Sequence, residues 1–144
     1  MTTRIISNPA RVYAYVASLM PMQMVEGMKG LGLEKGGELV AGVLYEGFNP
    51  YNVWMHVASH MPGAWLNRRF LWACFYYPFV EVGVKRVGVH VADGNTASRA
   101  FVDRLGFERE ATVKGAAMDG GDIGMYVMWR DNCRFIGERY GKRV

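Results

Sequence analysis

Apolar residues recur along this chain with two periods, one typical of helices and one typical of strands. In the stretch NPARVYAYVASLM, Val12, Val16 and Leu19 lie three or four residues apart, which predicts a helix with one buried face. Asn8 is a suitable N-cap, and Pro9 suits the first helical position. We therefore predict a helix that begins at Pro9.

Alternation with a period of two marks the expected strands. In KRVGVHVAD every second residue from position 87 to 91 is a valine, which predicts a central strand over residues 86–92. Runs rich in β-branched and aromatic residues predict further extended segments over residues 39–48, 53–59, 107–118 and 122–131. The turn residues DGGD join the last two.

A second helix is predicted over residues 64–77, before Pro78 disrupts it. Its expected buried face comprises Leu66, Phe70, Ala73 and Tyr77. The third helix begins after the N-cap Asn95 and ends at Gly106, which suits the left-handed position at a helix end. Its expected buried stripe comprises Ala97, Phe101 and Leu105. Helices and strands in this order predict a mixed α/β layer structure.

The composition fits one domain over residues 1–144. Hydrophobic residues make up 51% of the chain, but no apolar run approaches the roughly 20 residues that cross a bilayer. The first residues lack the pattern of a secretory signal, so we expect a cytoplasmic protein with no membrane partner. The net charge of +4 is modest for a nucleic-acid binder and suits an anionic ligand.

Cysteine and histidine spacing points away from metal chemistry. Cys74 and Cys133 are far apart and form no CxxC motif, so both are expected to be reduced thiols. His56, His60 and His90 show no metal-ligand spacing. No bound metal is therefore expected. Because the net charge is modest, no nucleic-acid partner is expected either.

Four residue strings resemble the GCN5-related N-acetyltransferase (GNAT) superfamily: N-x-x-S at 95–98, LGF at 105–107, ERE at 108–110 and DIGMYVM at 122–128. The resemblance extends from about Leu39 to Arg134 and is greatest to the ribosomal-protein alanine acetyltransferase branch and to small phage or prophage proteins. It implies an α/β (α+β) layered fold, with a mixed, mostly antiparallel sheet that contains two splayed parallel strands and is flanked by helices.

The resemblance also implies acetyl-CoA as cosubstrate, held between the strands at 53–59 and 86–92. Its pantetheine arm would pair with backbone freed at a bulge near Val57 and Ala58. Its pyrophosphate would lie at the N-terminus of the following helix, in the stretch SHMPGAWLNRRF. The family's glycine-rich pattern there is replaced at Pro62, Trp65 and Asn67. The expected phosphate contacts are Gly63, Asn67, Arg68 and Arg69.

The start of the third helix and the first parallel strand supply the other expected site residues. In the resembling proteins the residue at Asn95 contacts the cofactor arm, and Ser98 either caps the helix or lies near the thioester. Val102 occupies the position where many members carry a tyrosine acid, so Ser98 or water is expected to protonate the thiolate. His56 is the candidate base, because imidazole titrates near neutrality. A hydrogen-bonded structural histidine is the alternative.

Glu46, Glu81 and Glu110 are expected to be solvated carboxylates. The predicted function is transfer of an acetyl group from acetyl-CoA to a primary amine of a small molecule or protein, by direct attack in a ternary complex. The alternative is a catalytically degenerate member of the fold that acts as an interaction or phage virion-associated protein. A homodimer is left open.

Overall fold

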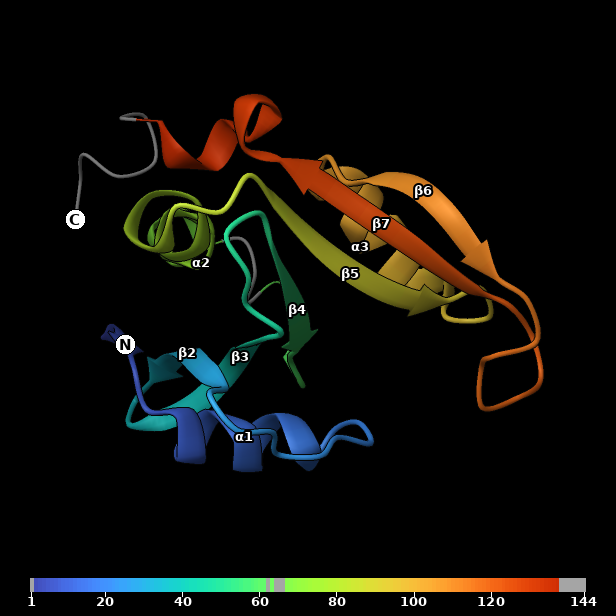
Figure 1. The fold of residues 1–144 in the computed structure, drawn as a ribbon. Helices are drawn as coiled ribbons and strands as arrows, with labels where there is room; N and C mark the ends of the chain where they lie inside the picture. Colours follow the sequence, from blue (N-terminus) through green and yellow to red (C-terminus); the bar gives the residue numbers. More distant parts are fainter. Residues whose placement is uncertain (1, 62, 64–66, 138–144) are drawn as a thin grey trace.

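The computed structural model describes residues 2–61, 63 and 67–137. Its strands form a seven-stranded sheet in the order β1-β2-β3-β4-β5-β7-β6 (Figure 1). They are β1 (Thr3–Ile6), β2 (Lys29–Lys35), β3 (Glu38–Glu46), β4 (Asn52–Ala58), β5 (Arg86–Ala92), β6 (Glu108–Val113) and β7 (Ile123–Trp129). β4 and β5 are parallel, and the other neighbours are antiparallel. The predicted α/β fold with a mixed, mostly antiparallel sheet is confirmed.

The helices divide between the two faces of the sheet (Figure 1). α1 (Pro9–Ala17) covers one face, where Val12 and Val16 pack with Leu44 of β3. α2 (Arg68–Tyr76) and α3 (Thr96–Leu105) pack on the other face, which holds the larger core cluster. Among the described residues, none of these helices is long and apolar enough to cross a membrane.

The three helices begin at capped residues, but their buried faces differ in part from those predicted. Ala97 is exposed, and α3 instead buries Val102 and Leu105. Leu19 lies beyond the end of α1 and is 42% exposed. The described part of α2 buries Phe70, Leu71, Cys74 and Phe75, whereas Ala73 and Tyr77 are half-buried. Leu66 lies outside the described residues.

Two strands, β1 and β2, were not predicted, and in β2 glycines interrupt the apolar pattern. These glycines let α1 lie close to the sheet. A Cβ atom on Gly30 would lie 3.1 Å from Cβ of Val12, and one on Gly32 would lie 3.2 Å from Cγ2 of Val12 and 2.7 Å from a methyl group of Leu39 in β3. The two glycines that interrupt the strand pattern in the sequence are therefore the residues that the close packing of α1 requires.

Pro78 does not simply end the second helix as predicted. α2 ends at Tyr76, and a π-helical turn, Tyr77–Val82, follows and ends at Gly83 with φ of 91°. Because Pro78 has no N–H, the carbonyl of Cys74 loses its helical donor. The Tyr45 hydroxyl donates a 2.6 Å hydrogen bond to that carbonyl instead. The bond ties the break in the helix to β3.

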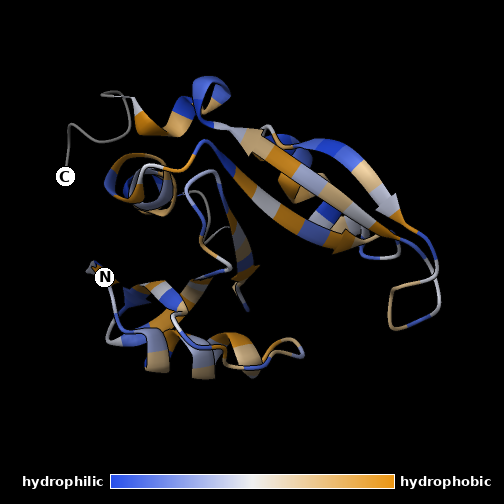
Figure 2. Ribbon diagram, viewed as in Figure 1, coloured by the Kyte–Doolittle hydropathy of each residue, from blue (hydrophilic) through white to orange (hydrophobic). Residues whose placement is uncertain are grey.

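Polar residues mark the edge of the sheet at β6, where every residue is exposed (Figure 2). At the other edge, Glu34 of β2 is buried and accepts hydrogen bonds from Arg4 of β1 and Arg11 of α1. The hydrogen bond from Arg11, aided by Arg4 and opposed by burial, lowers the pKa of Glu34. This carboxylate joins three elements of the fold.

We predict that Glu34→Gln lowers the free energy of unfolding at pH 7. A lowered pKa in the folded state stabilises the protein above the ordinary carboxyl pKa, and that contribution is lost as pH falls through the folded value. The difference in urea stability between the wild type and the variant should therefore begin to shrink near the ordinary glutamate pKa, about 4. It should vanish only below the lowered pKa of the folded state. Glu38→Gln, at an exposed position of β3, is the control. An equal difference at pH 7 and at acidic pH would contradict the assignment.

Candidate active site

The two parallel strands pair at their amino-terminal ends and then separate. β4 and β5 are in register at Asn52 with Arg86, Val53 with Val87 and Trp54 with Gly88, and no further pairs connect these two described strands. Both strands continue, to Ala58 and Ala92. Their facing edges therefore carry backbone N–H and C=O groups that do not bond each other. We call this opening the fork.

A tryptophan lies across the strands where the fork begins. The indole of Trp54 covers Gly88 so closely that a Cβ atom at Gly88 would overlap it. The same indole packs on the His90 ring, with centroids 4.5 Å apart. Glycine is required at position 88 because the indole occupies the space of a side chain.

His56 projects from β4 on the α1 face. It pairs with Leu44, which packs under α1, whereas Met55 and Val57 line the opposite side. His56 therefore lies on the opposite face of the strand from these apolar neighbours. Its Nε2 lies 2.8 Å from a carboxylate oxygen of Glu46, and the two side chains are 23% and 28% exposed.

The partner of His56 fixes its chemistry. A carboxylate only accepts hydrogen bonds, so Nε2 is the donor to Glu46, and in the neutral form of the ring the lone pair then lies on Nδ1. Glu46 was expected to be solvated, and that expectation is wrong. Glu110 is also engaged, because it accepts two hydrogen bonds from Arg86. No sequence motif indicates the Glu46–His56 pair, since the hairpin between β3 and β4 creates it.

His90 is a second histidine on the same face. Burial lowers the pKa of His90, the nearby His56 lowers it further, and Glu46 opposes both effects. His90 is therefore neutral at pH 7 and suits contact with the Trp54 ring. In the third histidine, His60, the Nδ1 atom lies 2.7 Å from the hydroxyl oxygen of Tyr15.

Both helices that follow the fork strands begin at asparagine caps. Asn67 accepts a hydrogen bond from the Phe70 N–H at 2.9 Å, and Asn95 accepts one from the Ser98 N–H at 3.1 Å. Because β4 and β5 run in parallel, both helix starts follow carboxyl ends of strands. Unpaired N–H groups and the helix dipole favour an anion at such starts.

The remaining predicted phosphate contacts lie near the start of α2. Arg68 and Arg69 are exposed in its first turn, and Gly63 is an exposed turn residue with φ of 81°. Pro62 and Trp65 lie outside the described residues. The caps leave the Asn67 and Asn95 side-chain NH₂ groups as donors.

Val57 and Ala58 end β4, but the expected bulge is absent from the described part of this strand. Its register with β3 is continuous from Trp54 to Ala58. The bulge prediction is wrong because divergence from β5, rather than a bulge, frees the strand edge. The side chain of Val57 packs toward the larger core and that of Ala58 toward the α1 cluster. At these two positions it is therefore the backbone, not a side chain, that faces the fork.

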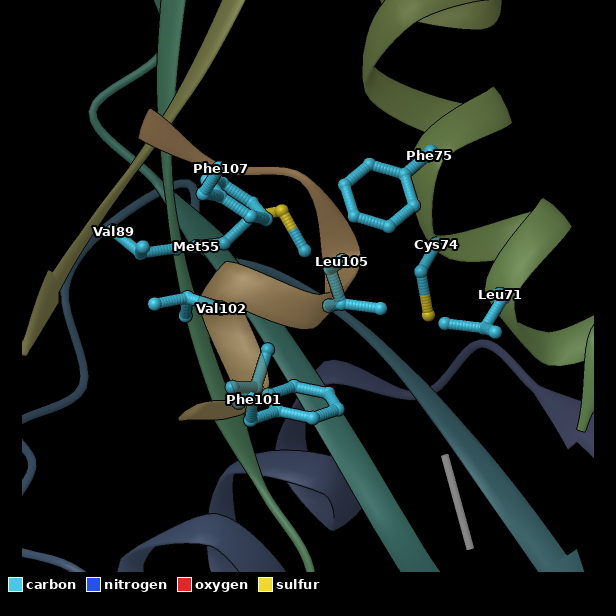
Figure 3. A pocket seen from close by; sticks show the side chains of 10 residues that line it. Met55, Leu71, Cys74, Phe75, Val89, Phe101, Val102, Leu105 and Phe107 are labelled. Carbon is cyan, nitrogen blue, oxygen red and sulfur yellow. The ribbon is translucent and has the colours of Figure 1, made fainter. Parts of the chain in front are cut away.

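An apolar cavity lies between β4, β5, α2 and α3 (Figure 3). Val102 and Cys74 line it, and Figure 3 shows the Cys74 sulfur beside Leu71. Its volume is about 10 Å³, enough for about one water molecule, and its lining is apolar. It is therefore a small gap in the core, and burial raises the pKa of the Cys74 thiol, which keeps it protonated.

Sequence patterns missed the ion pair that anchors the loop before α3. Arg109 of β6 donates to both carboxylate oxygens of Asp93, at 2.8 and 3.3 Å, and to the Tyr126 hydroxyl at 3.2 Å. The hydrogen bond from Arg109 lowers the pKa of Asp93 against the effect of burial. Gly124 lies beneath the guanidinium, where a Cβ atom would come within 2.7 Å of it. This contact positions the start of α3 beside the fork.

The sheet order and the fork define the fold of the GCN5-related N-acetyltransferases. A mutant form of the spermidine/spermine N-acetyltransferase SpeG from Vibrio cholerae is similar, with a TM-score of 0.74 and 11% identity over 90% of this chain and 96% of that chain. Two proteins designated acetyltransferases give TM-scores of 0.73 and 0.64 at 16% and 20% identity. They match 99% and 85% of this chain and 93% and 68% of their own chains. No protein-family model and no curated protein sequence matches.

We predict that Gly88→Ala destabilises the protein by roughly 1–3 kcal/mol, because the new methyl group must displace the Trp54 indole. The penalty should be much smaller when the same change is made in a Trp54→Leu background. Urea unfolding of the four proteins forms a double-mutant cycle that isolates this contact. Equal penalties in both backgrounds would show that the indole does not set the requirement for glycine.

Proposed function

We propose that this protein is an acetyl-CoA-dependent N-acetyltransferase that acts on a primary amine of a small molecule or a protein. The fork carries the proposal. It combines two parallel strand edges without mutual pairing, a helix start after each strand and an imidazole–carboxylate pair on one face. The likeness to solved acetyltransferases supports the same class of reaction.

Residues on the α2 and α3 side fit the cosubstrate. Backbone groups of β4 at Val57 and Ala58 are proposed to pair with the amides of the pantetheine arm. Arg68, Arg69 and the N–H groups at the start of α2 suit the pyrophosphate, because cationic donors and a helix N-terminus both favour a dianion. Asn95 retains an amide donor beside β5. Gly63 and Asn67 complete the proposed phosphate side.

Acetyl-CoA would supply the acetyl group as a thioester, so that transfer forms a C–N bond and breaks a C–S bond. We propose that His56 Nδ1 takes the proton that the protonated amine must lose before it attacks, while Glu46 holds the opposite ring nitrogen. Glu46 also stabilises the imidazolium that forms. Ser98, half-buried in the first turn of α3, or water is proposed to protonate the departing sulfur.

The acceptor is proposed to approach from the α1 face, where His56 projects. There a protonated amine would meet the Glu46 carboxylate and the Trp54 ring, and both attract cations. A cytoplasmic location and kinship with the alanine acetyltransferase branch or with phage-encoded proteins remain part of the proposal. The degenerate alternative rests on Val102 at the tyrosine position and on the altered phosphate loop.

We predict that Arg69→Ala weakens acetyl-CoA binding about tenfold, the loss expected for one charge-assisted hydrogen bond. Binding of acetyl-pantetheine, which lacks the phosphates, should change little. Calorimetric titration of both ligands makes the comparison, and Arg104→Ala in the last turn of α3 is the control. Equal losses for the two ligands would place Arg69 away from the phosphates, and no heat with millimolar acetyl-CoA would remove the cosubstrate proposal.

We predict that His56→Gln lowers turnover by roughly 10²-fold or more, because it removes a positioned proton acceptor. Acetyl-CoA affinity should stay nearly unchanged, and the rise of rate with pH on the acidic side should disappear. Glu46→Gln should lower turnover less, because the ring remains but loses its fixed orientation.

The measurement is the steady-state rate of acetylation across a panel of amines. His90→Gln, which changes another histidine on the same face of the sheet, is the control variant. Full activity of His56→Gln with an unchanged pH profile would assign the base elsewhere. A wild-type protein that binds acetyl-CoA but acetylates none of the amines would favour the degenerate alternative.

A further inference from the structure

A groove of about 450 Å³ lies between α2 with its π turn and the start of β2. Its volume is within the range of small-molecule sites. Trp72, Tyr76 and Tyr77 supply its aromatic wall, and Glu81 and Lys29 supply charged groups.

The groove lies on the opposite face of the sheet from His56. Lys29 pairs with Tyr45, whose hydroxyl reaches the Cys74 carbonyl of α2, so Lys29 faces the α2 side. His56 faces the α1 side. A ligand in the groove therefore cannot contact the proposed base, and the groove is a separate site.

The π turn brings the acidic and aromatic groups of the groove together. The turn, Tyr77–Val82, carries both Tyr77 and Glu81. Both residues line the groove. Burial raises the pKa of Tyr77, and the negative charge of Glu81 raises it further. Among the described residues Glu81 makes no ion pair, so its charge is available to a ligand.

The aromatic groups present ring surface in a fixed arrangement. Trp72 and Tyr76, one helical turn apart on α2, have ring centroids 4.5 Å apart and lie 30° from parallel. Tyr45 and Phe48 hold the Tyr77 ring through edge contacts at 5.1 and 6.4 Å. All three wall residues are half-buried, so part of each remains accessible.

We propose that this groove binds an organic ammonium ion through the rings of Trp72, Tyr76 and Tyr77 and the carboxylate of Glu81. Aromatic faces attract cations, and a nearby carboxylate adds direct charge attraction. Alkylated ammonium groups suit such a wall better than strongly hydrated metal ions, because their methyl or methylene groups also bury apolar surface. Lys29 opposes a cation and limits the affinity.

The test compares choline with 3,3-dimethylbutan-1-ol, its uncharged isostere, by titration of the full chain and NMR detection of the Trp72 indole N–H. Choline should bind about fivefold or more tightly than the alcohol, consistent with a cation–π and carboxylate contribution. Equal affinities for choline and the alcohol would show that the groove binds only apolar groups and does not recognise the positive charge, and this would overturn the proposal. This comparison uses the wild-type protein alone, so it does not depend on how any variant folds.

Variants then assign the charges. Glu81→Gln and Trp72→Leu should each weaken choline binding severalfold, and Lys29→Gln should strengthen it, whereas Glu38→Gln should have no effect. Unchanged binding by Glu81→Gln would overturn the assignment of the carboxylate. Acetyl-CoA binding should persist in Glu81→Gln, which distinguishes failure of this site from failure of the proposed enzyme function.

Discussion

The separation of β4 from β5 is the constraint on which the rest of the candidate site depends. Backbone groups that leave a sheet ladder need other partners, and beyond Trp54 and Gly88 the facing edges of the two strands do not satisfy each other. Each strand keeps its outer neighbour, β3 or β7, in regular register. The fork is therefore framed by sheet on both sides, which suits an extended ligand that needs hydrogen bonds at fixed spacing.

A single missing N–H shapes the carboxyl-terminal end of α2. Pro78 deprives Cys74 of its helical donor, and the buried Tyr45 hydroxyl replaces it. The replacement fixes α2 against β3 and so sets where its first turn lies relative to the end of β4. The π turn that follows places Tyr77 and Glu81 on the groove. Backbone hydrogen-bond satisfaction thus links the fork to the separate aromatic groove.

Local patterns in the sequence predicted most elements near the fork, because β5 alternates cleanly and α3 has both an asparagine cap and a glycine stop. They missed β1 and also β2, in which Gly30 and Gly32 serve the packing of α1 rather than the strand itself. They also missed the partner of His56. The Glu46–His56 pair depends on the hairpin register, in which Glu46 lies opposite Trp54 and diagonal to His56, and the two strand patterns alone do not fix that register.

The arrangement around His56 bears on whether the fork is catalytic or only structural. A structural histidine in a packed layer is expected to use both ring nitrogens, since unsatisfied buried polar groups are costly. Here Nε2 is committed to Glu46, while Nδ1 has no hydrogen-bond partner in the described part of the chain and the ring is 23% exposed. An oriented imidazole with one uncommitted ring nitrogen, on the strand that forms one edge of the fork, is consistent with the proposed proton acceptor. Val102 occupies the position where many members of the family carry a tyrosine, so this chain lacks that acid for protonating the sulfur. Water can also protonate the sulfur. The absence of the tyrosine therefore weakens the enzymatic proposal less than the absence of a base would.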